Sequence, residues 1–194
     1  MSSSRIKGRI LDAAIELFAA NGVNGVTFED LASKSKVTRG SIYRLFRTPE
    51  GLFEQALKTV LSRSLDPANF LLMIFEDKTH QEFPLLVAAA VRKWYYSISQ
   101  PEARLLMQAS FSDHQWQDSE GPVERLIKIL ATSIERQLKT EKSSKLNSTT
   151  VARSLVLGLF QLKLSFRPPG SAKEEKEAVE GMLQLWVKAV SGGA

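Results

Sequence analysis

The chain has 194 residues, a length that suits one compact unit or a small domain and a larger one. Hydrophobic residues make up 43% of it, which is enough to bury a core and argues against wholesale disorder. It contains no cysteine, which excludes disulfides, thiolate nucleophiles and cysteine metal sites. The net charge is +5, and residues 1–48 hold eight lysines and arginines against four acidic residues. Such a basic excess on a small module is typical of proteins that bind a phosphate backbone, although a solvated basic face has the same composition.

Membrane proteins and the common enzyme classes fit the sequence poorly. The longest mostly apolar runs are far shorter than the roughly 18–20 residues that span a bilayer, and the first residues lack the apolar core of a signal sequence. The chain has two histidines and no glycine-rich phosphate loop, HExxH or G-x-S-x-G pattern. We therefore expect a cytoplasmic protein that is not an enzyme, with no catalytic residue, metal site, cofactor or membrane contact.

The N-terminal segment predicts two helices in succession. Apolar residues recur on one face of residues 5–20, and Gly22 suits the left-handed conformation that follows a helix end. Thr27 is an N-cap candidate for the second helix, and Asp30 stands three residues on, which makes a near capping box with aspartate in the usual glutamate position. The second helix therefore begins at about residue 28.

A third helix is predicted over residues 39–46, after a joint of about four residues. Thr38 is its N-cap candidate, and Ile42 and Phe46 face inward, with Leu45 beside them. Two short helices joined in this way predict a helix-turn-helix, in which the second helix of the pair enters the major groove of DNA by its N-terminal residues.

The outer face of this third helix carries polar and basic side chains suited to DNA. With the caps and the turns, the candidate DNA-binding residues are Thr27, Lys36, Thr38, Arg39, Gly40, Ser41, Tyr43, Arg44, Arg47 and Thr48. Arg39 and Arg44 can each bond O6 and N7 of a guanine, or contact phosphate only. The Tyr43 hydroxyl can donate to a phosphate, and Gly40 permits close approach to the groove. Lys36 and Arg47 are expected to make simple electrostatic contacts with the phosphate backbone.

Two stretches resemble the N-terminal domain of the TetR family of bacterial repressors: the helix end ELFAANG, and VTFEDLASKSKVTRGSIYRLFRTPEGLF after it. The resemblance covers residues 6–53 approximately. It implies that the rest of the chain is an all-helical domain that dimerises and binds a small molecule, as such domains often do. It also implies double-stranded DNA as the partner.

The chain departs from the family pattern at two positions. Lys36 stands in the turn, where family members usually have glycine, so either this lysine adopts a strained left-handed conformation or the turn is built differently. Pro49 stands where the family tends to carry a lysine that touches phosphate. Thr48 and Pro49 instead form a good helix start, with a capping hydroxyl and a proline at the first position.

Hydrophobic spacing beyond residue 48 predicts helices almost throughout. They run from Pro49 to a break at Asp66-Pro67, over 68–75, over 83–99, from Gln100 through Phe111, from Pro122 through Ile134, over 151–166 and from Ser171 through Val190. No segment alternates at period two long enough to predict a strand. The predicted fold is all-α, with a three-helix DNA-binding domain at 1–48 and a larger effector-binding and dimerisation domain at 49–194.

The last two helices carry apolar residues on more than one side. A four-helix interface between two subunits, as the resemblance implies, would use Ala152, Leu155, Leu159, Leu162, Met182, Leu185, Trp186 and Ala189. A pair of helices buried inside a monomer would show the same pattern. Candidates to line an effector pocket, in which the polar ones could orient the effector, are Phe70, Met73, Trp94, Tyr95, Arg104, Met107, Gln108, Phe111 and Phe160. Aromatic and methionine residues at helical spacing are more often plain core.

These patterns lead to one hypothesis and one alternative. The hypothesis is a homodimeric transcriptional repressor that binds a pseudo-palindromic operator and is released by a small-molecule effector. The alternative is a helical interaction protein whose basic face docks an acidic partner. Discrimination between DNA duplexes of different sequence would separate the two.

Overall fold

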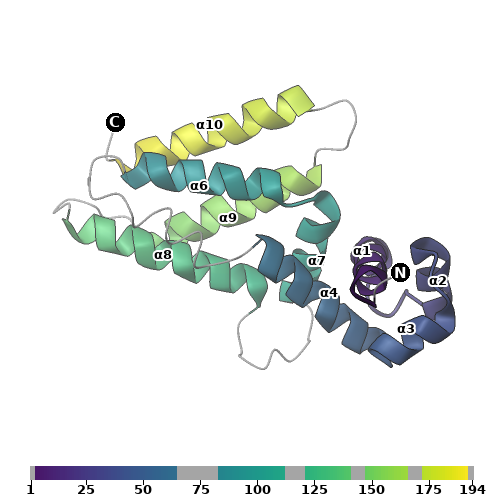
Figure 1. Ribbon diagram of the computed structural model, residues 1–194. Helices are drawn as coiled ribbons and strands as arrows, with labels where there is room; N and C mark the ends of the chain where they lie inside the picture. The colour runs from purple at the N-terminus through teal and green to yellow at the C-terminus, as the bar shows by residue number, and fades with distance from the viewer. Residues whose placement is uncertain (1–2, 65–82, 112–120, 141–146, 166–171, 192–194) are drawn as a thin grey trace. The chain divides into compact units, whose positions relative to one another are not determined.

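The computed structural model describes residues 3–64, 83–111, 121–140, 147–165 and 172–191 (Figure 1). Every regular element in these ranges is an α-helix, as the sequence predicts. The chain divides into two compact units, residues 1–63 with 99–114 and residues 64–98 with 115–194. The boundary between these two packing units does not lie after residue 48, where we expect the DNA-binding domain to end. The expected boundary divides the chain by function rather than by packing, and it stays a prediction. The helix expected over 68–75 lies outside the described residues.

The first unit contains α1 (Ser3–Asn21), α2 (Phe28–Ser35), α3 (Arg39–Phe46), α4 (Pro49–Ser64) and α7 (Gln100–Phe111). Its core joins α1 to α4, where the rings of Phe18 and Phe53 meet edge to face with centroids 5.4 Å apart. On α7, the Gln108 side chain donates to the carbonyl oxygen of Ala19 over 3.3 Å. These contacts tie α4 and α7 to α1, which explains why the unit extends beyond the first three helices.

The predicted capping box at the start of α2 is confirmed. The Thr27 hydroxyl accepts a hydrogen bond from the Asp30 N–H over 3.2 Å, and the Thr27 N–H donates to the Asp30 carboxylate over 2.9 Å. The same Thr27 bonds, first from its hydroxyl and then from its backbone, hold the pKa of Asp30 below its usual value. The end of α1 is also as predicted, because Gly22 has a φ of 72° and donates to the Phe18 carbonyl over 2.9 Å.

Replacing Thr27 by alanine should lower the free energy of unfolding by about 0.5–2 kcal/mol, because the Asp30 N–H loses its acceptor and the Asp30 carboxylate loses the hydroxyl donor. Thermal unfolding followed by circular dichroism measures this loss, with Ser4→Ala as a control on an exposed serine. Because folding lowers the pKa of Asp30, its carboxylate contributes to stability in full at pH values above the usual carboxylate pKa. This contribution is lost as the pH falls through the lowered pKa. A difference between the variants that persisted undiminished at pH 2 would contradict this role of Asp30.

The second unit contains α6 (Phe83–Ser97), α8 (Pro122–Thr140), α9 (Ser148–Ser165) and α10 (Ala172–Val190). Helix α9 packs on α8 and on α10, and α10 also packs on α6 (Figure 1). The Asn147 side chain accepts the N–H of Thr150 over 2.9 Å, so α9 is capped where the sequence predicts. Gly158 allows close packing of α9 and α10, because a Cβ there would collide with the end of the Met182 side chain.

A polar network that the sequence did not indicate fastens α10 to α6 and α9. The Arg92 guanidinium donates twice to the Glu180 carboxylate, over 2.6 and 2.7 Å. The Tyr95 hydroxyl donates to Glu175 over 2.7 Å, and the Lys163 ammonium lies 3.4 Å from the same carboxylate and 4.3 Å from the Tyr95 ring centroid. Burial, and then the bond to Glu175, raise the pKa of Tyr95, which therefore stays a neutral donor.

Candidate nucleic-acid interface

The turn between α2 and α3 is shorter than the sequence predicts. Helix α2 continues to Ser35, so only residues 36–38 form the joint. Lys36 follows with φ 54° and ψ 39°, the left-handed conformation, which is one of the two outcomes that the sequence left open. The Ser35 hydroxyl donates back to the Leu31 carbonyl over 2.6 Å, which a helical serine can do without ending the helix.

Arg9 of α1 reaches this turn, and sequence reasoning missed it. Its Nη2 donates to the Ser35 carbonyl over 2.5 Å and to the Lys36 carbonyl over 3.3 Å. These carbonyls belong to the end of α2, where helical partners run out. No local pattern pairs residues 26 and 27 positions apart, so only the fold reveals the contact.

Helix α3 begins at the predicted position but without the expected side-chain cap. Thr38 has extended backbone geometry, and its carbonyl accepts the N–H groups of Ser41 and Ile42 over 3.0 and 3.2 Å. Its hydroxyl lies 3.0 Å from the Ser41 hydroxyl and caps no backbone N–H. Thr38 is therefore the N-cap by backbone alone. Ile42 and Phe46 are buried as predicted, whereas Leu45 is 36% exposed.

The opposite face of α3 is open. Six of the predicted DNA contacts on and after it are exposed, namely Arg39, Gly40, Tyr43, Arg44, Arg47 and Thr48, and Ser41 is half-buried. No described residue forms a hydrogen bond or ion pair with the Arg44 side chain. An exposed arginine without such a partner is available to an anionic or polar partner.

Neighbouring side chains hold Tyr43 and Arg39 in place. The Tyr43 ring packs edge to face on Phe28 of α2, with centroids 4.5 Å apart, while the residue stays 44% exposed. Arg39 donates to the Tyr43 hydroxyl over 3.2 Å and also pairs with Glu29, a contact that sequence reasoning did not single out. The hydrogen bond with Tyr43 is the main cause of the raised pKa of Arg39.

Packing does not require the glycine at position 40. A Cβ built on Gly40 would meet no heavy atom within 4 Å. Glycine weakens a helix relative to alanine by up to about 1 kcal/mol. Among the described residues, no packing contact therefore accounts for a glycine at this position.

The end of α3 leads directly into α4. Arg47 has a φ of 47°, and its N–H donates to the Tyr43 carbonyl over 3.1 Å. The Thr48 hydroxyl accepts the N–H of Gly51 over 3.1 Å, so Thr48 and Pro49 form the helix start that the sequence predicts. Lys36 and Arg47, each at a positive φ, thus place a cation after each of the two helices of the motif.

The residues predicted to line an effector pocket are distributed over both units. In the second unit three of them are buried: Trp94, Tyr95 and Phe160. The rings of Trp94 and Phe160 meet edge to face at 5.4 Å. In the first unit α7 carries Arg104, which is exposed, and Met107 and Gln108, which are half-buried. The residues Phe70 and Met73, and the side chain of Phe111, lie outside the described part of the chain, so the pocket stays a prediction.

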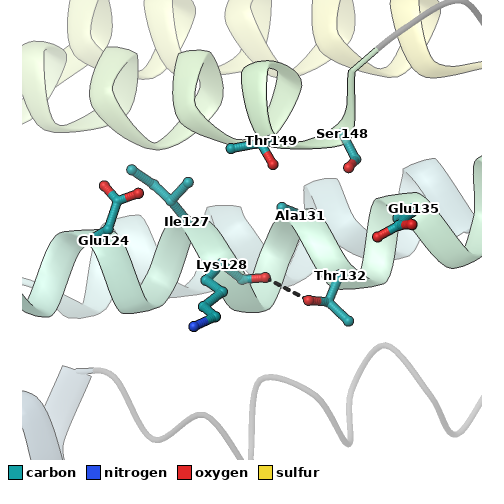
Figure 2. A pocket seen from close by; sticks show the side chains of 8 residues that line it. All are labelled: Glu124, Ile127, Lys128, Ala131, Thr132, Glu135, Ser148 and Thr149. Atoms are coloured by element: carbon teal, nitrogen blue, oxygen red, sulfur yellow. Dashed lines mark hydrogen bonds between the residues drawn. The ribbon is translucent and has the colours of Figure 1, made fainter. Parts of the chain in front are cut away.

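A hollow in the second unit involves none of these residues. It lies between α8 and the start of α9, as Figure 2 shows, and has a volume of about 170 Å³. Its lining is Glu124, Ile127, Lys128, Ala131, Thr132, Glu135, Ser148 and Thr149. Ligand pockets usually measure about 300–1,000 Å³ and are mostly apolar. This small, largely polar hollow does not match an effector pocket.

The predicted dimer residues divide by burial. Four of them are already buried within the single chain: Ala152, Leu155, Leu159 and Trp186. They form the core of the second unit, because α9 packs on α8 and α10, so they have no surface to offer a partner. The others keep some exposure: Leu162 and Met182 are half-buried, Ala189 is exposed, and Leu185 is 71% exposed. The interface itself stays a prediction.

Two short helices joined by a left-handed turn, with an exposed basic face on the second, define a helix-turn-helix DNA-binding protein. Residues 10–56 match the family described as bacterial regulatory proteins, tetR family. The chain is 25% identical to the biofilm operon icaADBC HTH-type negative transcriptional regulator IcaR of Staphylococcus aureus (strain Newman), over 94% of this chain and 100% of IcaR. The helix-turn-helix segment of this chain is thus similar to that of the TetR family of bacterial regulatory proteins.

Solved structures of bacterial regulators share the fold along nearly the whole chain. A regulatory protein of the tetR family from Rhodococcus RHA1 matches with a TM-score of 0.70 and 18% identity, over 96% of this chain and 97% of its own. AibR, solved in complex with isovaleryl coenzyme A and operator DNA, matches with a TM-score of 0.70 and 14% identity, over 93% of this chain and 97% of its own. The likeness in fold thus extends over the helical second unit as well as the first. Among the described residues, no helix has the length and apolarity needed to cross a membrane.

Proposed function

We propose that this protein is a homodimeric transcriptional repressor of the cytoplasm, which binds a pseudo-palindromic operator and is released from it by a small-molecule effector. The observation that carries DNA binding is the exposed face of α3. There Tyr43 is braced against Phe28, Arg44 has no partner among the described residues, and Gly40 is a glycine that packing does not require.

The proposed contacts divide into two kinds. Arg44 and Arg39 contact base edges in the major groove, where arginine pairs with guanine. The cations of Lys36 and Arg47 contact phosphates, because they flank α3 at the turns before and after it. The Tyr43 hydroxyl contacts a phosphate from the exposed face of α3 itself. Phosphate contacts position α3, and base contacts select the sequence. The capping threonines Thr27, Thr38 and Thr48, with Ser41, complete the proposed surface.

The proposed dimer uses the exposed apolar residues of α9 and α10. Leu185, at 71% exposure, is the most exposed large hydrophobic residue of the described chain, and Leu162, Met182 and Ala189 extend the surface. A two-fold interface pairs the same patch on both subunits and places two α3 helices about 34–36 Å apart, one turn of DNA.

Two buried indoles support an effector site in the second unit. The Nε1 atoms of Trp94 and Trp186 are buried and have no hydrogen-bond partner among the described residues. A buried donor without a partner costs about 1–3 kcal/mol, which a ligand with an acceptor atom would offset. The likeness to AibR, which binds both isovaleryl coenzyme A and operator DNA, supports a fold that holds both kinds of ligand. A thousandfold release from DNA requires about 4 kcal/mol of differential effector binding.

The proposal is tested by selecting bound duplexes from a random pool with the full-length protein. We expect enrichment of an inverted repeat, and subsequent binding assays should separate that duplex from a scrambled one at equal salt. A screen of small molecules against the selected complex then looks for release. Equal binding to all duplexes and to an acidic polypeptide would overturn the repressor proposal in favour of an acidic partner.

Replacing Gly40 by alanine should change stability and DNA binding in opposite directions. The fold gains up to about 1 kcal/mol, or a thermal midpoint about 2–4 °C higher, because alanine favours the helix and meets open space. Operator affinity falls by about tenfold, equivalent to 1.4 kcal/mol, because the methyl group separates α3 from the groove.

Gly181→Ala in α10 is the matched control, since a Cβ there also meets nothing within 4 Å. It should raise the thermal midpoint and leave operator affinity unchanged, as measured by fluorescence anisotropy. If Gly40→Ala bound the operator as well as the parent does, the close approach of α3 would be refuted.

A further inference from the structure

The end of α2 presents a local problem that its own sequence does not solve. The last carbonyls of a helix lack helical partners, and glycine usually follows because it adopts the left-handed conformation freely. Here Lys36 takes that conformation, with φ 54° and ψ 39°. A side chain in this region is strained, because its Cβ approaches the following carbonyl oxygen. Contacts elsewhere must therefore stabilise the turn.

Arg9 supplies such contacts from α1. Its Nη2 donates to the carbonyls of both Ser35 and Lys36, over 2.5 and 3.3 Å. A guanidinium at this place satisfies two acceptors at once and carries the charge that the C-terminal end of a helix favours. One residue thus acts on both sides of the left-handed position.

A second contact fixes the same turn of helix. Lys34 of α2 pairs with Glu16 of α1 over 2.5 Å, and Ser35 is buried, at 5% exposure. The end of α2 is therefore held to α1 on both sides of Ser35. Since α3 begins three residues later, the direction of the chain at Lys36 determines where the exposed face of α3 stands.

We propose that Arg9 is a positioning residue for DNA binding. Its guanidinium fixes the end of α2, so that a lysine can occupy the left-handed position and hold its ammonium group toward the phosphate backbone. Glycine at that position would form the turn unaided but would supply no charge. The inference rests on the proposed DNA binding, and it assigns to Arg9 no contact with DNA.

The test is a double-mutant cycle with Arg9→Ala, Lys36→Gly and the two together, measured on the full chain with the selected operator duplex. Arg9→Ala alone should weaken operator binding by about tenfold and lower the thermal midpoint by about 2–6 °C. Lys36→Gly alone should weaken binding by a few-fold and reduce the salt dependence by about one phosphate contact. In the Lys36→Gly background, Arg9→Ala should weaken operator binding by less than about threefold. It should lower the thermal midpoint by less than half as much as it does in the parent protein.

Arg63→Ala is the matched control. It removes an arginine that also pairs with α1, through Asp12 over 3.1 Å, but forms no hydrogen bond or ion pair with the described residues of the turn. Its operator affinity should remain within about threefold of the parent. Arg9→Lys should recover part of the loss, because a lysine keeps the charge but cannot repeat the planar guanidinium geometry.

The outcomes separate this inference from the proposed function. Equal losses from Arg9→Ala in both backgrounds would overturn the positioning role, since Arg9 would then act independently of the conformation at Lys36. Unchanged affinity of Arg9→Ala would overturn it as well. A parent protein that prefers no duplex would refute the DNA-binding proposal itself, while the thermal midpoints of the four variants would still decide whether Arg9 stabilises the turn.

Discussion

Arg44→Ala is expected to weaken operator binding by about 5- to 150-fold for each half-site, which corresponds to 1–3 kcal/mol for the loss of one bidentate contact with a base. The reason is the position of Arg44 on the exposed face of α3, where no described residue bonds its side chain. The guanidinium does not have to leave an internal partner before it contacts DNA. In a dimer the substitution occurs twice, so the loss for the full operator is larger than for one half-site.

The measurement is fluorescence anisotropy with the selected duplex and with duplexes changed at single base pairs. Arg44→Ala should also relax the preference at one base position, whereas loss of a phosphate contact would weaken all duplexes about equally. Lys93→Ala, which removes an exposed cation from α6, controls for the change in net charge and should bind like the parent. Uniform weakening across all duplexes would reassign Arg44 to the phosphate backbone.

The parts of the site that the sequence predicted are those fixed by local interactions. The capping box joins residues three apart, and the spacing of Ile42 and Phe46 marks the buried side of α3. Such signals lie within one or two turns of helix. They were sufficient for the helix starts at Thr27 and Thr48 and for the choice of the exposed face.

The conformation of the turn between α2 and α3 could not be predicted from such local patterns. The sequence showed a lysine where glycine is usual and left the conformation of Lys36 open. The structure resolves the question through Arg9, which lies on another helix and bonds the carbonyls of residues 35 and 36. A contact of this range depends on how α1 and α2 pack, and no local pattern encodes that packing.

In the second unit, local patterns were likewise insufficient to assign the apolar residues to the core or to an interface. Hydrophobic spacing marked both sides of α9 and α10 but could not distinguish core from interface. Leu155 and Leu159 are covered inside the chain because α9 packs on α8, while Leu185 is left exposed. The ion pair of Arg92 with Glu180, 88 residues apart, was likewise outside the reach of spacing arguments.

Leu185→Glu is expected to convert the proposed dimer into a monomer and to weaken operator binding by about 100-fold or more. Leu185 is 71% exposed in the single chain, so a charge there is tolerated by the isolated subunit. In a two-fold interface the residue occurs on both subunits, and burying two unpaired carboxylates opposes association strongly. Separation of the subunits also removes the effective concentration that one bound half-site gives the other, which is worth about 10²–10⁴-fold.

Light scattering at micromolar concentration measures the mass, and anisotropy measures the binding of the full operator and of a half-site. The variant should have half the mass of the parent and should unfold thermally as a folded single subunit. It should bind the full operator and the half-site with similar affinity. Leu85→Glu is the matched control, because Leu85 on α6 is also exposed, at 59%, but lies outside α9 and α10. If Leu85→Glu gave the monomer and Leu185→Glu remained dimeric, the interface would belong to α6, and the spacing of the two α3 helices would have to be rebuilt from that face.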